Sequence, residues 1–259
     1  MSIVALSVTE TRKFRRRLLA WFSARKRDLP WRRTKDPYRI WLSEIMLQQT
    51  RVVAVVPYFE SFLARFPDMQ ALARARDEAV LSHWAGLGYY SRARNLLRAA
   101  QVIDAKHDGR FPSEYDAALA LPGIGRYSAA AVLSIAYDKP LAVLDGNVAR
   151  VLARLGAVRG ELRAPGIWRK LEATAQELLA QKAPGDWNQA MMELGATVCT
   201  PKSPKCEECP VANWCRALKL GIADQLPDAR KKRSPIKITL AAAILVDPRG
   251  RTLLVRRAG

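Results

Sequence analysis

The segment LPGIGRYSAAAVLS at residues 121–134 places a tight turn with two glycines directly before a run of helix-forming residues. Gly123 and Gly125 permit positive φ angles and let another molecule approach the backbone closely. The following helix begins with free N–H groups and a partial positive charge, which together suit a phosphate. The segment has the pattern of a helix-hairpin-helix turn over about residues 114–137, and together with the positive net charge and the cysteines described below it favours DNA binding through Gly123 and Gly125. The alternative is an ordinary helix–helix connection, in which glycine is also common.

The composition favours a polyanionic partner. The 259 residues include 43 Lys and Arg against 24 Asp and Glu, which gives a formal net charge of +19. Such an excess is costly in self-repulsion unless a polyanion binds, so we expect nucleic acid before an anionic membrane surface. No apolar run is long enough to span a membrane, and the N-terminus lacks a signal-peptide pattern. We therefore expect a cytoplasmic protein, associated with the nucleoid through DNA and not with a membrane.

Hydrophobic periodicity predicts a mainly α-helical chain. Helices are expected at residues 11–27, 38–49, 52–66, 78–85, 89–107, 113–121, 127–137, 146–155, 168–181 and 187–199. Candidate N-caps are Asp36, Asp77, Asp145 and Asp186. The polar, basic stretch at residues 223–236 reads as a linker. Beyond it, β-rich runs within residues 237–259 flank the turn DPRG and predict a hairpin that begins a second domain.

The four cysteines all lie between residues 199 and 215, in the pattern C-x6-C-x2-C-x5-C. They are Cys199, Cys206, Cys209 and Cys215. In a reducing compartment, four clustered thiolates suit Zn²⁺ or an iron–sulfur cluster, and the alternative is two local disulfides or four unrelated thiols. The spacing leaves zinc and iron–sulfur open. Lys202 and Lys205, in the first loop between cysteines, either contact a phosphate backbone or offset the charge of the cluster.

Two carboxylates are candidates for chemistry. Glu44 lies in the nearly apolar run WLSEIMLQQT at residues 41–50, where burial raises the pKa of a carboxyl unless an arginine pairs with it. Asp145 precedes Gly146 in LDGNV, where a role as an N-cap is the alternative. Two carboxylates from distant parts of a chain suit glycosidic cleavage, because one protonates the leaving group and the other stabilises an oxocarbenium-like state.

The sequence resembles the endonuclease III superfamily of DNA glycosylases, and within it the MutY-type adenine glycosylases. The matching stretches are DLPWR (28–32), WLSEIMLQQTRV (41–52), GLGYYSRARNL (86–96), LPGIGRYSAAAVLS (121–134), LDGNVARVLAR (144–154), NQAMMELGA (188–196) and the cysteine pattern. The resemblance implies a two-lobed helical core at residues 1–222 with an iron–sulfur loop at 199–215. It also implies that residues 237–259 are the truncated start of a Nudix-like α/β domain that senses 8-oxoguanine.

The resemblance implies a monomeric, monofunctional enzyme of base excision repair. It would release adenine from duplex DNA in which adenine lies opposite 8-oxoguanine or guanine. Glu44 would protonate the adenine, Asp145 would stabilise the positive sugar, and Asn147 would help to position it. Tyr127 occupies the place where bifunctional relatives carry a Schiff-base lysine, so strand cleavage is expected to be absent or weak.

The remaining implied roles concern DNA, the base and the cofactor. Gln48 and Tyr89 would enter the base stack and hold the gap that the extruded base leaves. The adenine pocket would be lined by Arg27, Leu29, Trp31, Arg32 and Gln189. The cysteines would hold a 4Fe–4S cluster. By residue type alone, Tyr89 and Trp31 are explained equally well as aromatic residues of a hydrophobic core.

Two other functions compete with this one. The first is a mismatch-specific thymine glycosylase of the same superfamily, and LQQT at residues 47–50 favours adenine over it. The second is a cluster-bearing module that binds DNA without cutting it, and the intact pair of Glu44 and Asp145 argues against it.

Overall fold

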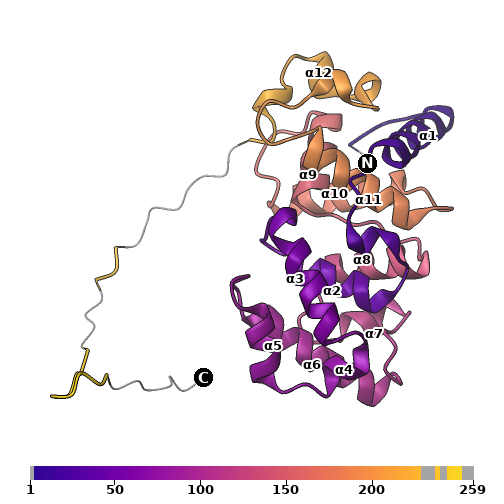
Figure 1. Cartoon of the computed structure of the whole chain (residues 1–259). Coiled ribbons are helices and arrows are strands. Elements are labelled where there is room, and N and C mark those ends of the chain that lie inside the picture. The colour runs from indigo at the N-terminus through magenta and orange to yellow at the C-terminus, as the bar shows by residue number, and fades with distance from the viewer. Residues whose placement is uncertain (1–2, 229–236, 240–243, 253–259) are drawn as a thin grey trace. The chain divides into compact units, whose positions relative to one another are not determined.

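The computed structural model describes residues 3–228, 237–239 and 244–252. The chain divides into one compact unit, Met1–Ala229, and a second unit, Arg230–Gly259. The first unit is built from helices and connecting loops (Figure 1). The α-helices are α1 (Val8–Arg25), α2 (Pro37–Leu47), α3 (Val52–Arg65), α4 (Met69–Ala73), α5 (Asp77–Trp84), α6 (Ser91–Lys106), α7 (Tyr115–Leu119), α8 (Arg126–Tyr137), α9 (Gly146–Gly156), α10 (Pro165–Leu178), α11 (Pro184–Thr197) and α12 (Arg216–Lys219). The 3₁₀ helices are η1 (Pro30–Arg33), η2 (Cys206–Glu208), η3 (Ala212–Trp214) and η4 (Ala223–Gln225). The predicted mainly α-helical fold is confirmed.

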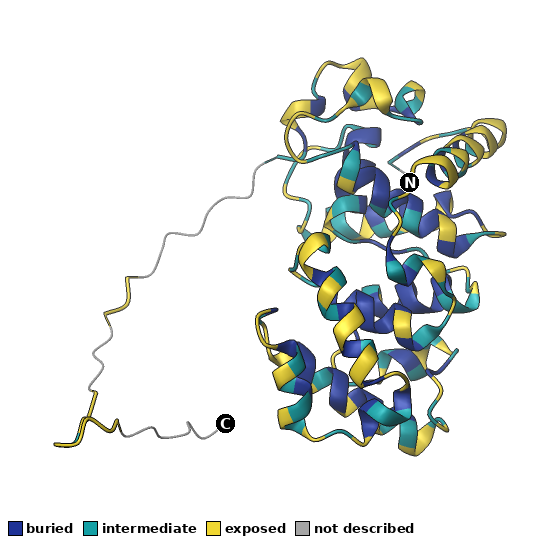
Figure 2. Ribbon diagram, viewed as in Figure 1, coloured by how far each residue is buried: buried dark blue, intermediate teal, exposed yellow. Residues whose placement is uncertain are grey.

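Two hydrophobic clusters give the first unit its two lobes. One cluster joins α2 to α8 and contains the fully buried Trp41 and Trp84. The other joins α1 to α9, α10, α11 and α12 and contains Phe14 and Trp187. Helix α8 belongs to both clusters, and all its residues from Ser128 to Ile135 are buried. Figure 2 shows that buried residues gather on the inner sides of the helices of both lobes. Because the N-terminal helix packs against α11, the second lobe is closed by segments from both ends of this unit.

Local signals set several helix starts as predicted, and two predicted caps are wrong. The Asp36 side chain accepts a hydrogen bond from the backbone N–H of Tyr38 at the start of α2. Asp77 and Asp186, in contrast, lie inside the first turns of α5 and α11, and neither caps its helix. Acidic groups are favourable anywhere in a first turn because of the helix dipole, so the sequence does not separate these positions.

The glycine turn between α7 and α8 uses its two glycines differently. Gly123 has a φ of +74°, and a Cβ there would come within 2.6 Å of the Asn95 side chain. Gly125 is the N-cap of α8 with φ −99° and has open space around its Cα. Gly123 thus uses the positive φ that glycine permits, and Gly125 does not. Its missing side chain instead leaves the first turn of α8 open.

Three further differences from the predicted organisation concern short segments. Helix α4, capped by Asp68, is too short to produce a periodic pattern and was not expected. Residues 223–228 were expected to open the linker, but Leu226 is buried in the second lobe and Asp228 accepts hydrogen bonds from Arg159 and Gly160. The core therefore extends beyond residue 222. The predicted linker residues 229–236 lie outside the described residues.

The second unit is described only in part. Val246 and Thr252 form an antiparallel bridge around a turn at residues 247–250. The remainder of the predicted hairpin falls largely on residues 240–243 and 253–259, which lie outside the described residues, so the Nudix-like domain stays a prediction. Within the described ranges, no helix combines the length and the apolar character that crossing a membrane requires.

Candidate active site

One cavity of about 650 Å³ opens between the two lobes. This volume is within the usual range of about 300–1,000 Å³ for ligand pockets. Its lining combines the C-terminal half of α2, the N-termini of α8 and α9, and one face of α11. The sequence-predicted residues that it brings together are Arg27, Leu29, Trp31, Arg32, Glu44, Gln48, Gly125, Tyr127, Asp145, Asn147 and Gln189. Segments more than a hundred residues apart thus share one site.

Glu44 is a buried carboxyl on the cavity wall, with 7% of its surface exposed. The Tyr127 hydroxyl donates a hydrogen bond to Glu44 Oε2 at 2.8 Å. Burial, with a smaller contribution from nearby Asp145, raises the pKa of Glu44 to about 7, although the Tyr127 hydrogen bond and Arg32 oppose the rise. In the described part of the chain no arginine forms an ion pair with Glu44. A substantial fraction of Glu44 therefore carries a proton at neutral pH.

Asp145 is the N-cap of α9 and also faces the cavity. Its Oδ1 accepts a hydrogen bond from the backbone N–H of Val148 at 2.7 Å, and its Oδ2 accepts one from Asn147 Nδ2 at 3.0 Å. Burial raises the pKa of Asp145, and these two hydrogen bonds oppose that rise. The helix-capping role and a chemical role are thus compatible, because the capped carboxylate is held with its charge directed at the cavity.

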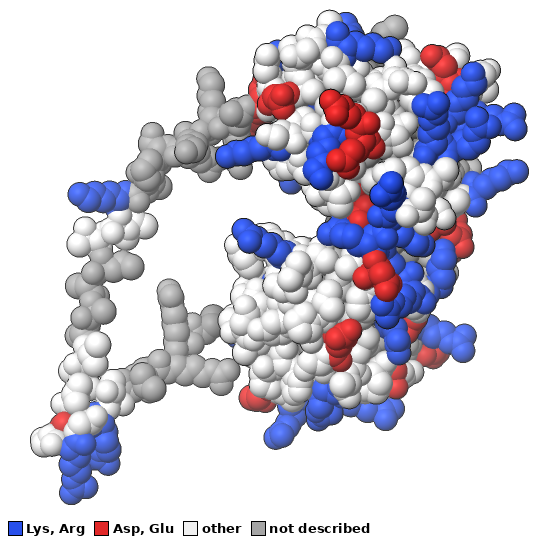
Figure 3. All heavy atoms as spheres, turned by 45° about the horizontal axis from the view of Figure 1, so that its top comes forward, with Lys and Arg blue, Asp and Glu red and all other residues white. Residues whose placement is uncertain are grey.

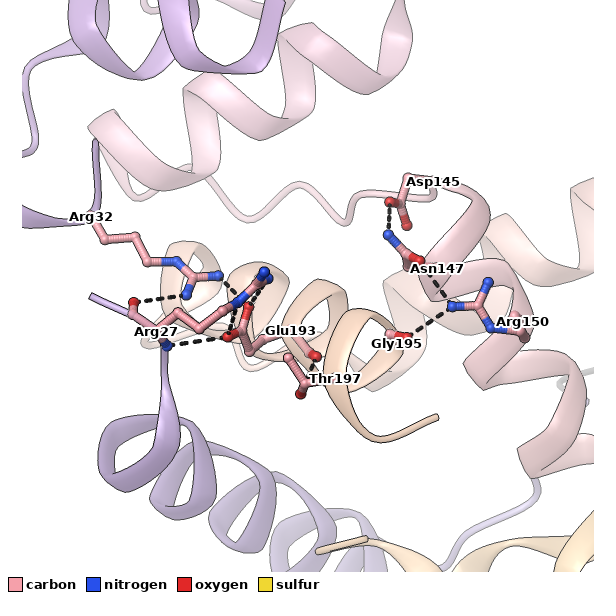
Figure 4. A network of polar contacts seen from close by, with 8 residues as sticks. All are labelled: Arg27, Arg32, Asp145, Asn147, Arg150, Glu193, Gly195 and Thr197. Atoms are coloured by element: carbon pink, nitrogen blue, oxygen red, sulfur yellow. Dashed lines mark hydrogen bonds and ion pairs between the residues drawn. The ribbon is translucent and has the colours of Figure 1, made fainter. Parts of the chain in front are cut away.

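The Asp145 carboxylate is supported by a chain of polar contacts (Figure 4). Arg150 Nη2 donates to Asn147 Oδ1 at 2.9 Å and to the Gly195 carbonyl at 2.8 Å. Arg150 Nε donates to the carbonyl of Cys199 at 2.9 Å. The orientation of Asp145 therefore depends, through Asn147 and Arg150, on the backbone at the first cysteine. No local signal in the sequence marks Arg150, because its partners Gly195 and Cys199 lie far along the chain.

Glu193 on α11 is the other acidic residue of the cavity wall, and sequence reasoning missed it. Its carboxylate accepts hydrogen bonds from Arg27 Nε and Nη2, both at 2.7 Å, and from Arg32 Nη2 at 2.8 Å (Figure 4). Burial alone would raise the pKa of Glu193, but these hydrogen bonds outweigh it and lower the pKa to about 2. Positions 189, 192, 193 and 196 all line the cavity, so helical periodicity was the signal available.

We expect Glu193→Gln to lower the free energy of unfolding by about 3 kcal/mol, near the lower end of the cost of breaking a buried pair, because Arg27 is partly exposed. Chemical denaturation with a fitted slope measures this loss. Asp28→Asn, which breaks an exposed pair with Arg33, is the control and should leave the free energy of unfolding nearly unchanged. Equal losses in the two variants would contradict the assignment of Glu193 as a buried anchor.

The four cysteines lie around a separate, small cavity in the second lobe. All four are free thiols, so the alternative of local disulfides is not what the structure shows. Within the described residues, no three Cys, His, Asp or Glu side chains converge closely enough for a single metal ion. Four sulfurs around one cavity are the soft ligands that an iron–sulfur cluster requires. Arg154, which is buried, donates to Cys199 Sγ at 3.3 Å and to the Thr200 carbonyl at 2.7 Å.

Of the residues expected to contact DNA, Gln48 and Gly125 line the main cavity and the others do not. Tyr89 is 59% exposed with φ +49°, which excludes the core-aromatic interpretation for it, whereas Trp31 is buried against Phe59 and also lines the cavity. Lys202 and Lys205 are exposed on the cysteine loop, away from the cavity lining, and Lys205 lies 3.8 Å from Glu208. On the face shown in Figure 3, basic side chains outnumber acidic ones.

Comparisons with known proteins agree with this architecture. Residues 42–182 match the HhH-GPD superfamily of base excision DNA repair proteins. Human adenine DNA glycosylase is 44% identical over 228 residues, which cover 85% of this chain and 42% of the human protein. This chain thus spans about two fifths of that relative. A solved structure of a thermostable thymine-DNA glycosylase has a TM-score of 0.73 and 29% identity, covering 81% of this chain and 97% of that one. Endonuclease III, trapped as a covalent intermediate with DNA, has a TM-score of 0.70 and 21% identity over 84% of this chain and 100% of that one, which shows the shared fold.

The cysteine segment has a match of its own. Residues 199–215 match the iron–sulfur binding domain of endonuclease III, and this match begins at Cys199 and ends at Cys215. The cofactor of this segment is a 4Fe–4S cluster, which resolves the choice that spacing left open. The superfamily match covers more than half of the chain and includes both the glycine turn and Asp145. The chain belongs to the HhH-GPD superfamily of base excision DNA repair proteins.

Proposed function

We propose that this chain is a monofunctional DNA glycosylase that hydrolyses the N-glycosidic bond of adenine opposite 8-oxoguanine or guanine in duplex DNA. The observation that carries the proposal is the pairing of two carboxyl groups in one cavity. Glu44 is buried with a pKa of about 7, and Asp145 is held by two hydrogen-bond donors. An acid and an anion facing the same space are what cleavage of a glycosidic bond needs.

The proposed reaction begins with DNA bound through its backbone as a complex with one copy of the chain. The first turn of α8, after Gly123 and Gly125, accepts a phosphate, and Lys202 and Lys205 add positive charge on the cysteine loop. Gln48 and Tyr89 enter the base stack, and the adenine rotates into the cavity. Unstacking costs a few kcal/mol and costs least at a mismatch, which gives some selectivity before chemistry.

In the chemical step, Glu44 donates its proton to a ring nitrogen of adenine while the bond between that base and C1′ breaks. The adenine leaves with the bonding electron pair, and the Asp145 carboxylate stabilises the positive sugar. Asn147 holds Asp145 in place through its side-chain amide. Water then adds to C1′, and the proton that it loses restores the acid.

The four cysteines, Cys199, Cys206, Cys209 and Cys215, would hold the 4Fe–4S cluster in this proposal. Their thiolates are soft ligands of the kind that such clusters require. The bound cluster would fix the cysteine loop by tying its two ends to one group. That loop also touches the support of Asp145, because Arg150 contacts the Cys199 carbonyl.

A thymine glycosylase acting on mismatches is the second candidate, favoured by the structural similarity to the thermostable thymine-DNA glycosylase. Identification of the released base distinguishes the two. The cluster-loaded chain is incubated with duplexes that contain A opposite 8-oxoguanine, A opposite guanine, or T opposite guanine, and the free bases are separated. We expect adenine from the first two duplexes and no thymine. Release of thymine alone would contradict the proposal, and release of no base would support a binding module.

The pKa of Glu44 predicts the pH dependence of single-turnover adenine release. Because Glu44 acts in its protonated form, the rate should fall as the pH rises through about 7. Tyr127→Phe removes a hydrogen bond that favours the charged form of Glu44, so the pKa of Glu44 should rise further. The descending limb should therefore move to higher pH in this variant. A limb that stays in place or moves to lower pH would contradict the assignment of Glu44 as the acid.

The position of Tyr127 predicts a gain of function. Tyr127→Lys places a primary amine on the cavity wall, where it can attack C1′ and form an imine with the opened sugar. We expect some strand nicking above the wild-type background, together with a covalent protein–DNA complex after borohydride reduction. Gel electrophoresis with labelled DNA measures both products. The absence of any trapped complex would show that this position does not face C1′.

A further inference from the structure

Arg92 is a buried charged residue with no role in the reaction described above. It is the second residue of α6, which packs against α2, and only 8% of its surface is exposed. Among the described residues no carboxylate pairs with its guanidinium. Taking a guanidinium out of water is costly unless its donors are satisfied. Its Nε is buried without a hydrogen-bond partner, so only Nη1 and Nη2 are satisfied, and the contacts of these two atoms indicate what the side chain holds.

The first branch of the guanidinium contacts the end of the helix that carries Glu44. Arg92 Nη1 donates to the carbonyls of Ile45 and Met46, both at 2.9 Å, and also to the carbonyl of Gln48. Ile45 and Met46 belong to the last turn of α2, whose carbonyls have no partner within the helix. A cation at this end also opposes the negative end of the helix dipole. Arg92 thus caps α2 immediately after Glu44.

The second branch contacts the loop that carries Tyr89. Arg92 Nη2 donates to the carbonyls of Leu87 at 3.1 Å and Gly88 at 3.2 Å, and to Thr50 Oγ1 at 3.2 Å. Its guanidinium also lies over the Tyr89 ring, with 5.6 Å between the guanidinium carbon and the ring centroid. The two segments that one side chain joins are thus Gln48–Thr50 and Leu87–Tyr89.

Both joined segments have unusual backbone conformations. Gln49 has a φ of +60° and Tyr89 a φ of +49°, angles that non-glycine residues adopt at a cost. Such angles persist where surrounding contacts hold them. Four of the hydrogen bonds from Arg92 end on residues next to or near these two positions, namely Gln48, Thr50, Leu87 and Gly88. Arg92 is therefore placed to fix both conformations at once.

We propose that Arg92 is a positioning residue that fixes the Gln48–Thr50 and Leu87–Tyr89 segments as one rigid wedge and sets this wedge relative to Glu44. The inference rests on the proposed function, in which Gln48 and Tyr89 enter the base stack. If the two segments are already rigid, less free energy is lost in ordering them when they enter the DNA. Loss of Arg92 should therefore impair extrusion of the base more than cleavage of its glycosidic bond.

The test compares two duplexes that differ in the cost of extrusion. In one, adenine lies opposite guanine, and in the other it lies opposite an abasic site, where no pairing partner holds it. Arg92→Lys keeps the charge but loses the planar fork that reaches both segments. We expect its single-turnover rate to fall about tenfold or more on the first duplex, since hydrogen bonds from charged groups are strong. On the second duplex we expect a loss of no more than about threefold.

Controls separate this effect from misfolding. Arg98→Lys makes the same substitution at an exposed position of α6 and should match the wild type on both duplexes. Thr50→Val removes the hydroxyl that accepts from Arg92 Nη2 and donates to the Gln48 carbonyl, and it should give a few-fold loss on the guanine duplex only. If Arg92→Lys does not fold with its cluster, Thr50→Val decides the question. Equal losses on the two duplexes, or no loss, would overturn the proposal.

A direct readout of extrusion completes the experiment. In a Glu44→Gln background, 2-aminopurine replaces the target adenine, and its fluorescence increases when the base leaves the stack. Adding Arg92→Lys should abolish most of this increase, and an unchanged increase would overturn the proposal. Failure of the proposed function is distinguishable, because the wild-type chain would then release no adenine from either duplex.

Discussion

Glu44→Gln is expected to bind duplex DNA normally and to release adenine about 10²–10⁴-fold more slowly than the wild type, the range typical for loss of a general acid. The substitution preserves size and leaves an oxygen that accepts the hydrogen bond from Tyr127. It removes the proton that the base needs in order to leave as a neutral molecule. Single-turnover rates on a duplex with A opposite 8-oxoguanine measure the loss, and binding to the same duplex is measured separately.

Stability provides the control for this variant. The pKa of Glu44 is about 7 in the folded chain and near its ordinary 4.5 in an unfolded one, so the folded state binds this proton more tightly. The free energy of unfolding of the wild type therefore falls as the pH rises from about 4.5 through about 7. A glutamine at position 44 has no proton to lose, so the variant lacks this contribution to the fall. At pH 8 the variant should be at least as stable as the wild type. Glu60→Gln, on the exposed side of α3, should alter neither rate nor stability. Near-normal adenine release by Glu44→Gln would refute its role.

Asp145→Asn is expected to slow adenine release by about 10²–10³-fold, which is the usual effect of removing one electrostatic contact to a transition state. Asparagine is as good an N-cap as aspartate, so the hydrogen bond from the Val148 N–H and the start of α9 should survive. The negative charge of Asp145 beside the sugar is lost, because asparagine is neutral. The variant thus separates the two functions of Asp145.

The comparison with alanine shows that separation. Asp145→Ala loses the charge and the cap together, so it should cost a further 0.5–2 kcal/mol or so in free energy of unfolding. Asp145→Asn should unfold close to the wild type in the same denaturant series. If Asp145→Asn retains a wild-type rate, then Asp145 is only an N-cap. If both variants lose rate only in proportion to stability, the same conclusion holds.

The sequence predicted those parts of the site whose signals are local. Glu44 is conspicuous because it is a carboxylate in an apolar run, and burial raises its pKa as expected. Asp145 is conspicuous because it precedes a glycine at a helix start. Most helices followed from hydrophobic periodicity, with ends shifted by a few residues where caps and dipole signals overlap. Their mutual placement, and hence the cavity, followed only from the family resemblance.

The roles of residues whose contacts lie far along the chain did not follow from the sequence. Glu193 is opposite in charge to Arg27 and Arg32, but more than 160 positions separate them in the chain. Arg92 and Arg150 looked like two more members of a strongly basic surface, and the structure buries both among backbone carbonyls. A basic composition conceals such residues, because charge alone does not show which arginines face solvent. The reverse error occurred at Asp77 and Asp186, because the N-cap positions are Arg76 and Ala183 and no side chain caps either helix.

The central claim is that one adenine, turned out of the duplex, lies between Glu44 and Asp145. A crystal structure of cluster-loaded Glu44→Gln with a duplex containing A opposite 8-oxoguanine measures its position directly. We predict adenine in the cavity between the lobes, with the side-chain amide at position 44 within hydrogen-bond distance of a ring nitrogen and Asp145 facing the sugar. Adenine that stays stacked in the duplex, or that occupies a place away from either side chain, would contradict the account.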